Sequence, residues 1–234
     1  EASKTLNFPI SKTMRIAQQL YEGVDVKGQG TVGLITYLRT DSVRISDEAD
    51  ADARAYIAQN YGEEFVATQT VTQKGGAKIQ DAHEAIRPSD IARTPAVVKE
   101  SLSRDQFRLY QLIWKRFVAS RMMPAVYETT SVKIAAGKYR FNVATSKIAF
   151  EGFRLIYTEA GEEKDEKGVL LKGLDENSEL SLKQFDSKQH FTQPPAHYTE
   201  ASLVKTLEEL GIGRPSTYAP TITLIINRRY VAKE

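Results

Sequence analysis

The residues best suited to chemistry lie in one short run with an extended pattern, Gly33-Leu-Ile-Thr-Tyr37-Leu-Arg39-Thr-Asp41-Ser42. Because alternate side chains of an extended chain share a face, Tyr37, Arg39 and Asp41 could converge on one anion. A tyrosine can attack phosphorus when an arginine, with its planar pair of donors, neutralises the charge that grows on the phosphate oxygens. The run is therefore a candidate site for chemistry on a phosphate ester.

Attack by a tyrosine also requires its phenol to lose a proton, and the spacing of Tyr37, Arg39 and Asp41 does not by itself explain how. Deprotonating a phenol whose pKa is about 10 costs about 4 kcal/mol at pH 7, so a base or a strong positive field must lie close by. On spacing alone, a packed tyrosine beside a structural arginine–aspartate pair is the more ordinary interpretation. The surrounding sequence has to decide between the two.

Two common classes of site are excluded by other patterns. The segment Gly28-Gln-Gly30-Thr-Val-Gly33 matches the dinucleotide-binding pattern G-x-G-x-x-G, but no apolar strand precedes it and no helix follows it. The three histidines, His83, His190 and His197, do not have the spacing of metal ligands, and the chain has no cysteine. We therefore expect neither a dinucleotide site nor a transition-metal site.

Composition places the chain among globular proteins without naming a partner. Its 234 residues carry 32 Lys and Arg against 30 Asp and Glu, a net charge of +2, and 41% of them are hydrophobic. Residues 159–187 hold nine acids and four lysines, so the rest of the chain carries +7. No stretch approaches the roughly 18 apolar residues of a membrane span, so we expect no membrane partner. Any nucleic acid must be held by local groups and not by the overall charge.

The first of three compositional zones, residues 1–123, has the periodicity of helices. Ser46 and Thr94 have the residue types and positions of helix N-caps, and Ser103 with Gln106 forms a capping-box pattern. The predicted helices run from about Ser11 to Gly23, from Ser46 to Gly62, from Thr94-Pro95 onward, and from Arg104 to Met122. On the last of them a stripe that includes Tyr110 and Trp114 predicts a core-facing surface.

The second and third zones differ from the first. Residues 124–191 show strand periodicity, and the predicted strands are Val126 to Ala135, Tyr139 to Phe150, Phe153 to Thr158, and shorter runs near Leu170 and Leu180. In residues 192–234, Thr199 caps a helix to Leu210, Gly211 ends it, and a second helix runs from Ser216 or Thr217 to about Arg229. Helix, glycine turn and helix is the outline of a helix-turn-helix element.

The Tyr37 run resembles the active-site segment of type IA DNA topoisomerases, and Leu38 is typical of the bacterial topoisomerase I branch. Two further matches follow in the order of that family. They are Ala82-His83-Glu84-Ala85-Ile86-Arg87-Pro88, and Gln193-Pro-Pro195 through Tyr198-Thr-Glu-Ala-Ser-Leu-Val204 to Gly211-Ile-Gly-Arg214-Pro-Ser-Thr-Tyr218-Ala219. The segment Gln19-Leu-Tyr-Glu-Gly23 also matches. Together these motifs span essentially the whole chain.

The resemblance implies a role for each matching residue. Tyr37 would be the nucleophile that cleaves single-stranded DNA through a 5′-phosphotyrosyl link, and religation would need no ATP. Arg39 would hold the scissile phosphate, and His83, oriented by Asp41, would contact it. The supporting residues would be Thr36, Asp41 and Ser42, and a strand phosphate would bind Arg214, Ser216 and Thr217. Lys74 and Lys78, just before His83, would suit a mobile loop near the DNA backbone, and an ordinary surface loop explains them equally well.

The resemblance also implies an α+β multidomain architecture that is part of a toroidal enzyme. The expected parts are a helical domain with Tyr37, a partial β-rich arch and a helical segment that binds single strands. Because the chain starts with Glu1 and lacks the acidic Toprim motifs, we interpret it as a central fragment that holds no metal itself. In the intact enzyme Mg²⁺ would bind the Toprim domain. The expected partners are single-stranded or negatively supercoiled DNA and the remaining domains, in the cytoplasm.

One alternative from another class stays open. In a non-catalytic DNA-binding module, the helix-turn-helix near Arg214 would read duplex DNA and Tyr37 would be structural. Preference for single strands over duplex, with a dependence on salt, would separate the topoisomerase interpretation from this one. We also expect that the isolated fragment cannot relax supercoiled DNA.

Overall fold

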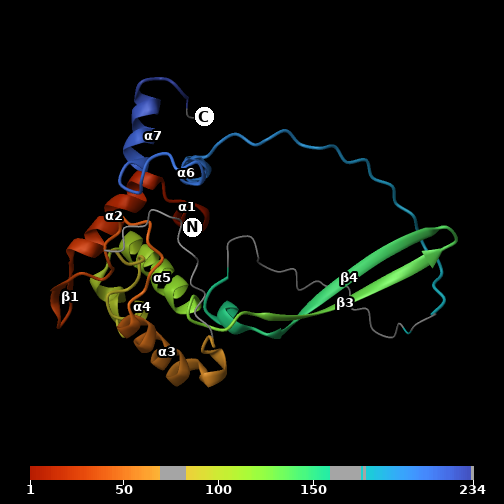
Figure 1. Cartoon of the computed structure of the whole chain (residues 1–234), viewed down its shortest axis with the longest axis horizontal. Coiled ribbons are helices and arrows are strands. Elements are labelled where there is room, and N and C mark those ends of the chain that lie inside the picture. Colours follow the sequence, from red (N-terminus) through yellow and green to blue (C-terminus); the bar gives the residue numbers. More distant parts are fainter. Residues whose placement is uncertain (69–82, 159–174, 176–177, 233–234) are drawn as a thin grey trace.

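A helical body, a long two-stranded hairpin and a final pair of helices make up the molecule (Figure 1). The computed structural model describes residues 1–68, 83–158, 175 and 178–232. From the body the chain runs out along the hairpin, and residues 178–199 return without helix or strand to the final helices, which lie beside α2 (Figure 1). The chain therefore mixes helices with β structure, as the sequence predicts.

The body is built from short helices whose ends are set by local side chains. They are α1 (Ala2–Leu6), α2 (Ile10–Glu22), α3 (Asp47–Tyr61), α4 (Pro95–Val98) and α5 (Arg104–Ala119), with single 3₁₀ turns at Glu63–Phe65 and Lys99–Ser101. Ser46 accepts a hydrogen bond from the N–H of Ala49, and Ser103 forms the predicted capping box with Gln106. These caps confirm the starts of α3 and α5, because each satisfies a free N–H of the first turn.

The core of the body surrounds α5 and includes the segment 33–38 that leads to Tyr37. Tyr110 and Val118 on α5 are fully buried, and so are Leu20 on α2 and Leu34, with Leu38 nearly so. Before this segment, β1 (Val24–Val26) and β2 (Gly30–Val32) form a small antiparallel hairpin. The glycines of the rejected dinucleotide pattern thus serve a tight turn, where Gly28 and Gly30 have positive φ.

The second zone contains one exposed hairpin. Strands β3 (Val126–Ala136) and β4 (Tyr139–Phe150) pair antiparallel, with Val132 opposite Val143 and a turn at Gly137, where φ is +58°. Neither strand contains a buried residue, and the ring of Phe150 at the end of β4 lies 4.8 Å from the ring of Phe65 in the body. The two predicted strands are therefore confirmed, but they form a ribbon that projects from the body (Figure 1).

The predicted strand from Phe153 to Thr158 is wrong. The chain instead forms a 3₁₀ turn, Gly152–Leu155, that carries it back to the body. A Cβ on Gly152 would lie 2.4 Å from the carbonyl oxygen of Met123, so only glycine permits this close return. Tyr157 is buried there and accepts a hydrogen bond from Arg116 on α5. The apolar pattern reflects packing on α5 and not a sheet.

The rest of the middle zone gives no further strand among the described residues. Residues 178–199 are exposed and extended without a partner, so the strand predicted near Leu180 is also wrong. The run near Leu170 and the acidic run from Gly161 to Gly168 lie outside the described residues. Among the residues that the structure describes, the predicted β-rich zone therefore contains β3 and β4 as its only strands.

The last zone forms the predicted pair of helices, α6 (Glu200–Glu209) and α7 (Tyr218–Asn227). Thr199 caps α6 as predicted, by accepting a hydrogen bond from the N–H of Ser202. Gly211 and Gly213 both have positive φ in the turn between the helices. Helix α7 contacts both α6 and α2, so this pair lies against the same body that carries Tyr37.

Candidate active site

Tyr37 lies at the surface in a segment, residues 33–38, whose apolar side chains belong to the core. Leu34 and Leu38 are buried, whereas Tyr37, Arg39 and Asp41 are exposed, with 38% of Tyr37 accessible. The N–H of Leu34 donates to the carbonyl oxygen of Leu20 at 2.7 Å, which fixes the segment against the end of α2. The predicted alternation thus holds in burial, and it turns the three chemical side chains outward.

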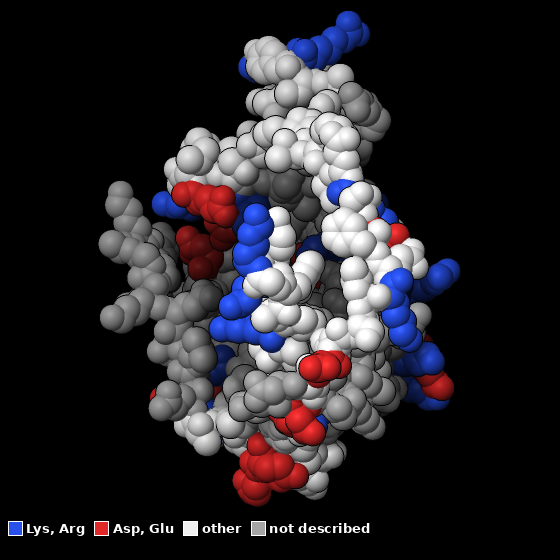
Figure 2. Space-filling model, turned by 90° about the vertical axis from the view of Figure 1, so that its right-hand side faces the viewer, with Lys and Arg blue, Asp and Glu red and all other residues white. Residues whose placement is uncertain are grey.

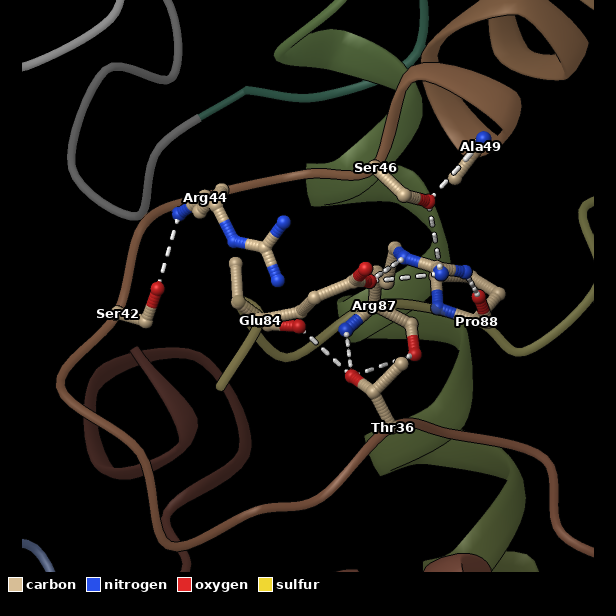
Figure 3. A network of polar contacts seen from close by, with 9 residues as sticks. Thr36, Ser42, Arg44, Ser46, Ala49, Glu84, Arg87 and Pro88 are labelled. Atoms are coloured by element: carbon tan, nitrogen blue, oxygen red, sulfur yellow. Dashed lines mark hydrogen bonds and ion pairs between the residues drawn. The ribbon is translucent and has the colours of Figure 1, made fainter. Parts of the chain in front are cut away.

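Thr36 joins the Tyr37 run to the segment that contains His83 (Figure 3). Its hydroxyl donates to the carbonyl oxygen of Ala85 at 2.7 Å and accepts from the N–H of Arg87 at 3.0 Å. Its N–H donates to the carbonyl oxygen of Arg87 at 2.9 Å, and Ile35 forms a β-bridge with Pro88. The resemblance implies a supporting role for Thr36, and these hydrogen bonds link the Tyr37 run to the segment that contains His83.

An ion pair that sequence reasoning missed stiffens the same segment. The guanidinium of Arg87 donates to Glu84 at 2.8 and 3.0 Å, to the carbonyl oxygen of Pro88 at 2.9 Å and to Ser46 at 3.5 Å (Figure 3). Ser46 is also the N-cap of α3, so the His83 segment is tied to the start of that helix. The three-residue spacing of Glu84 and Arg87 is the signal that could have revealed the pair.

The structure brings His83 to Tyr37, as the resemblance implies. Their ring centroids lie 5.4 Å apart with an interplanar angle of 33°. A second ring, that of Tyr21 at the end of α2, lies 5.5 Å from the Tyr37 ring in an edge-to-face arrangement at 69°. Tyr21 was not among the predicted site residues, although it belongs to the matching segment Gln19-Leu-Tyr-Glu-Gly23.

Ser42 and Asp41 have different surroundings. Ser42 is buried and accepts a hydrogen bond from the N–H of Arg44, whose carbonyl oxygen accepts from Ala85 (Figure 3). Ser42 therefore supports the site through the backbone, as a member of the supporting shell would. Asp41 is exposed, and within the described part of the chain it forms no hydrogen bond with His83. The expected orientation of His83 by Asp41 is thus not seen, and the contacts of neighbouring residues hold that segment.

The turn between α6 and α7 lies near Arg39. A cavity of about 500 Å³ between α2 and α7 is lined by both Arg39 and Ser216, together with Met14 of α2 and Leu224 of α7. Arg214 is exposed. The Thr217 hydroxyl accepts from the N–H of Arg214 at 2.9 Å, so it serves first to close the turn.

Charged groups around this turn affect the pKa of Tyr218, at the start of α7. Burial raises the pKa of Tyr218, the carboxylates of Glu208 and Asp41 act in the same direction, and Arg214 opposes them. Asp41 and Arg214 therefore lie close enough to the same phenol to act on it. The start of α7 thus lies near four of the predicted site residues, Arg39, Asp41, Arg214 and Ser216.

Charge is mixed on the face from which the hairpin projects. Figure 2 shows Lys and Arg interspersed with Asp and Glu there, without a surface of one sign. Among the described residues, no group of three or more His, Asp or Glu could hold a metal ion, and no helix is long and apolar enough to cross a membrane. Lys74 and Lys78 lie outside the described residues. The face shown therefore offers charges of both signs and not a cationic surface.

Two comparisons with known proteins bear on the family of the chain. A family model described as DNA topoisomerase matches residues 1–234. A solved structure of full-length topoisomerase I from Thermotoga maritima is 40% identical to the chain and superposes with a TM-score of 0.75. The match covers 100% of this chain and 37% of that one, so the chain spans well under half the length of the protein it resembles.

Proposed function

The chain belongs to the DNA topoisomerase family, and from this premise we propose that it carries the nucleophile of a type IA enzyme. The observation that most directly supports the proposal is the exposed phenol of Tyr37 beside the ring of His83, on a segment anchored in the core. A structural tyrosine would have no need of this exposure or of the Thr36 contact between the two segments.

In the proposed reaction, the phenol oxygen of Tyr37 attacks the phosphorus of a phosphodiester in single-stranded DNA. The bond from phosphorus to the 3′ oxygen breaks, a phosphotyrosyl bond forms to the 5′ phosphate, and the phenol proton is balanced by the proton gained at the free 3′ hydroxyl. Since one ester replaces another, the reverse step reseals the strand without ATP. Strand passage through the open break would then relax negative supercoils.

Arg39 and His83 are proposed to act on the phosphate. The guanidinium of Arg39 is exposed and lines the α2–α7 cavity, from which it could neutralise charge on the phosphate oxygens. The His83 ring is close enough to Tyr37 to contact the same phosphate group. Arg214, Ser216 and Thr217 are proposed to bind a neighbouring phosphate, because all three are exposed and Arg214 adds a positive charge.

Type IA chemistry also uses Mg²⁺ and an acid for the leaving oxygen. The described residues do not fit that ion, because none of their acidic and histidine side chains are grouped to hold it. We propose that the ion binds a Toprim domain of the complete enzyme, meaning the polypeptide that carries these 234 residues with the Toprim and C-terminal domains. The 234 residues by themselves should then not relax supercoiled DNA.

The test is to trap the covalent complex. The complete enzyme is mixed with a single-stranded oligonucleotide labelled at its 3′ end, and the reaction is stopped with detergent. Tyr37→Phe should abolish the labelled protein band, since the nucleophilic oxygen is gone. Tyr139→Phe is the matched control, because Tyr139 is exposed at the far end of the hairpin. A covalent complex that persists in Tyr37→Phe would refute the proposal.

A further inference from the structure

Within the described part of the chain, the ring of Tyr37 contacts two other aromatic rings, and its hydroxyl forms no hydrogen bond. The Tyr21 ring meets it edge to face at 5.5 Å, and the His83 ring lies 5.4 Å away. A free hydroxyl is what an attacking oxygen requires, but it leaves the orientation of the ring to other contacts. A side chain that is 38% exposed can otherwise populate several staggered rotamers.

Tyr21 is itself held in place by the segment that carries Tyr37. A Cβ on Gly33 would lie 2.6 Å from the carbonyl oxygen of Tyr21, so the two backbones touch where only glycine fits. Leu20, which precedes Tyr21, and Leu34, which follows Gly33, are fully buried and joined by a hydrogen bond of 2.7 Å. These contacts fix the backbone of Tyr21 against the segment that carries Tyr37, and from there the Tyr21 ring reaches the Tyr37 ring.

Edge-to-face contacts between aromatic rings favour one relative orientation over its alternatives by about three- to tenfold. Nucleophilic attack requires the phenol oxygen in line with the leaving group, so a rotamer that points elsewhere contributes nothing to the rate. A preferred orientation of the Tyr37 ring therefore raises the rate of the bond-forming step. It does not change how tightly the strand binds to groups such as Arg214.

We propose that Tyr21 is a positioning residue for Tyr37, whose ring holds the phenol in the orientation that attacks DNA. This rests on the proposed function of Tyr37. The Tyr21 hydroxyl has no role in the proposal, since it has no hydrogen-bond partner among the described residues. Tyr21 acts through the edge of its ring, and a phenylalanine can replace it.

The experiment measures cleavage rate and strand affinity separately in the complete enzyme. Rates of covalent complex formation come from single turnovers with enzyme in excess, and the Kd comes from fluorescence anisotropy in a Tyr37→Phe background. Tyr21→Leu should slow cleavage about three- to tenfold and leave the Kd within about twofold. Tyr21→Phe should cleave within about twofold of the parent enzyme, because it keeps the ring.

The matched control is Tyr61→Leu. Tyr61 lies at the end of α3, as Tyr21 lies at the end of α2, and its ring contacts Tyr56 and not Tyr37. Tyr61→Leu should leave the cleavage rate unchanged at equal folded concentration. Thermal unfolding of all variants shows whether Tyr21→Leu loses more stability than this control.

Each outcome bears on the proposal. Unchanged cleavage in Tyr21→Leu would overturn it, and so would equal slowing in Tyr21→Phe, which would assign the effect to the hydroxyl. Slowing that comes with a matching loss of strand affinity, or with a larger loss of stability than in Tyr61→Leu, would make Tyr21 merely structural. The Tyr37→Phe result is read independently, so failure of the nucleophile assignment is distinguishable from failure of the Tyr21 proposal.

Discussion

The segment that carries Tyr37 and the turn that carries Arg214 are held by the molecule in opposite ways. The first has buried residues on either side of Tyr37 and hydrogen bonds to two other segments, through Leu20 and Arg87. The second, residues 211–217, is almost entirely exposed, and the contacts that close it are internal, from Arg214 to Thr217. The Tyr37 segment is therefore packed into the body, whereas residues 211–217 lie on its surface.

This difference matches two kinds of chemical demand. A nucleophile must reach an in-line position within a fraction of an ångström, which requires rigid surroundings. A phosphate contact relies on a charge interaction that tolerates larger displacement. Substitutions in the Tyr37 region should therefore change stability and cleavage rate. Substitutions in the α6–α7 turn should change strand affinity and leave stability alone.

The largest effect on the free energy of unfolding is expected from Arg87→Ala. The change leaves the partly buried carboxylate of Glu84 without its guanidinium and removes the contact with Ser46. We expect a loss of about 2 kcal/mol in urea unfolding, together with slower cleavage. Lys147→Ala is the control, because Lys147 pairs with Glu128 in a largely exposed bridge and should cost almost nothing. Equal losses in both variants would contradict the comparison.

The next largest loss in the free energy of unfolding is expected from Thr36→Val. Valine keeps the shape but removes the hydroxyl, so the N–H of Arg87 and the carbonyl oxygen of Ala85 each lose a partner. We expect a loss of about 1–2 kcal/mol in the free energy of unfolding. Cleavage should slow while the strand Kd stays constant. Thr31→Val, at an exposed position of β2, provides the control, and a weaker strand Kd in Thr36→Val would argue against a rigid-support role.

Acid should weaken the body and not the α6–α7 turn. Burial alone would raise the pKa of Asp50, but the hydrogen bonds and charges of Arg54 and Arg121 outweigh it and hold that pKa below its usual value. A lowered pKa in the folded state contributes stability above the unfolded pKa of about 4, and this is lost as the pH falls through the folded value.

The check is Asp50→Asn, measured by urea unfolding from pH 6 to pH 2.5. The variant should be less stable than the parent protein at pH 6, and the gap should close as the pH falls below about 4. A gap that stays constant with pH would show that Asp50 contributes by hydrogen bonding and not by its charge.

Local signals explain which parts of the fold could be predicted. The starts of α3 and α5 follow from Ser46 and Ser103, because a cap acts within one helical turn. The error at Phe153 to Thr158 has the opposite origin. Alternating apolar residues fit a strand and a turn pressed on a helix equally well, and the close return at Gly152 depends on Met123 and Pro124.

The same distinction holds for the site. The motif resemblance assigns Tyr37 and His83 to one phosphate without any knowledge of the packing, although it does not predict the contact between their rings. The contact with Tyr21 could not, because it arises where the backbone of α2 crosses Gly33. The link from Arg87 to Ser46 spans 41 residues and depends in the same way on tertiary packing.

The smallest effect on stability, and the sharpest test of the exposed region, is expected from Arg214→Ala. Its loss should leave the free energy of unfolding within about 0.5 kcal/mol of the parent value, since its side chain supports nothing buried. Strand affinity should fall, and the slope of log K against log salt should shrink by about 0.7, because one fewer phosphate is neutralised on a single strand. Lys205→Ala, in an exposed pair on α6, should change neither. If Arg214→Ala weakened duplex binding more than single-strand binding, α6 and α7 would be acting as a duplex reader. An unchanged salt slope would remove Arg214 from the phosphate contacts.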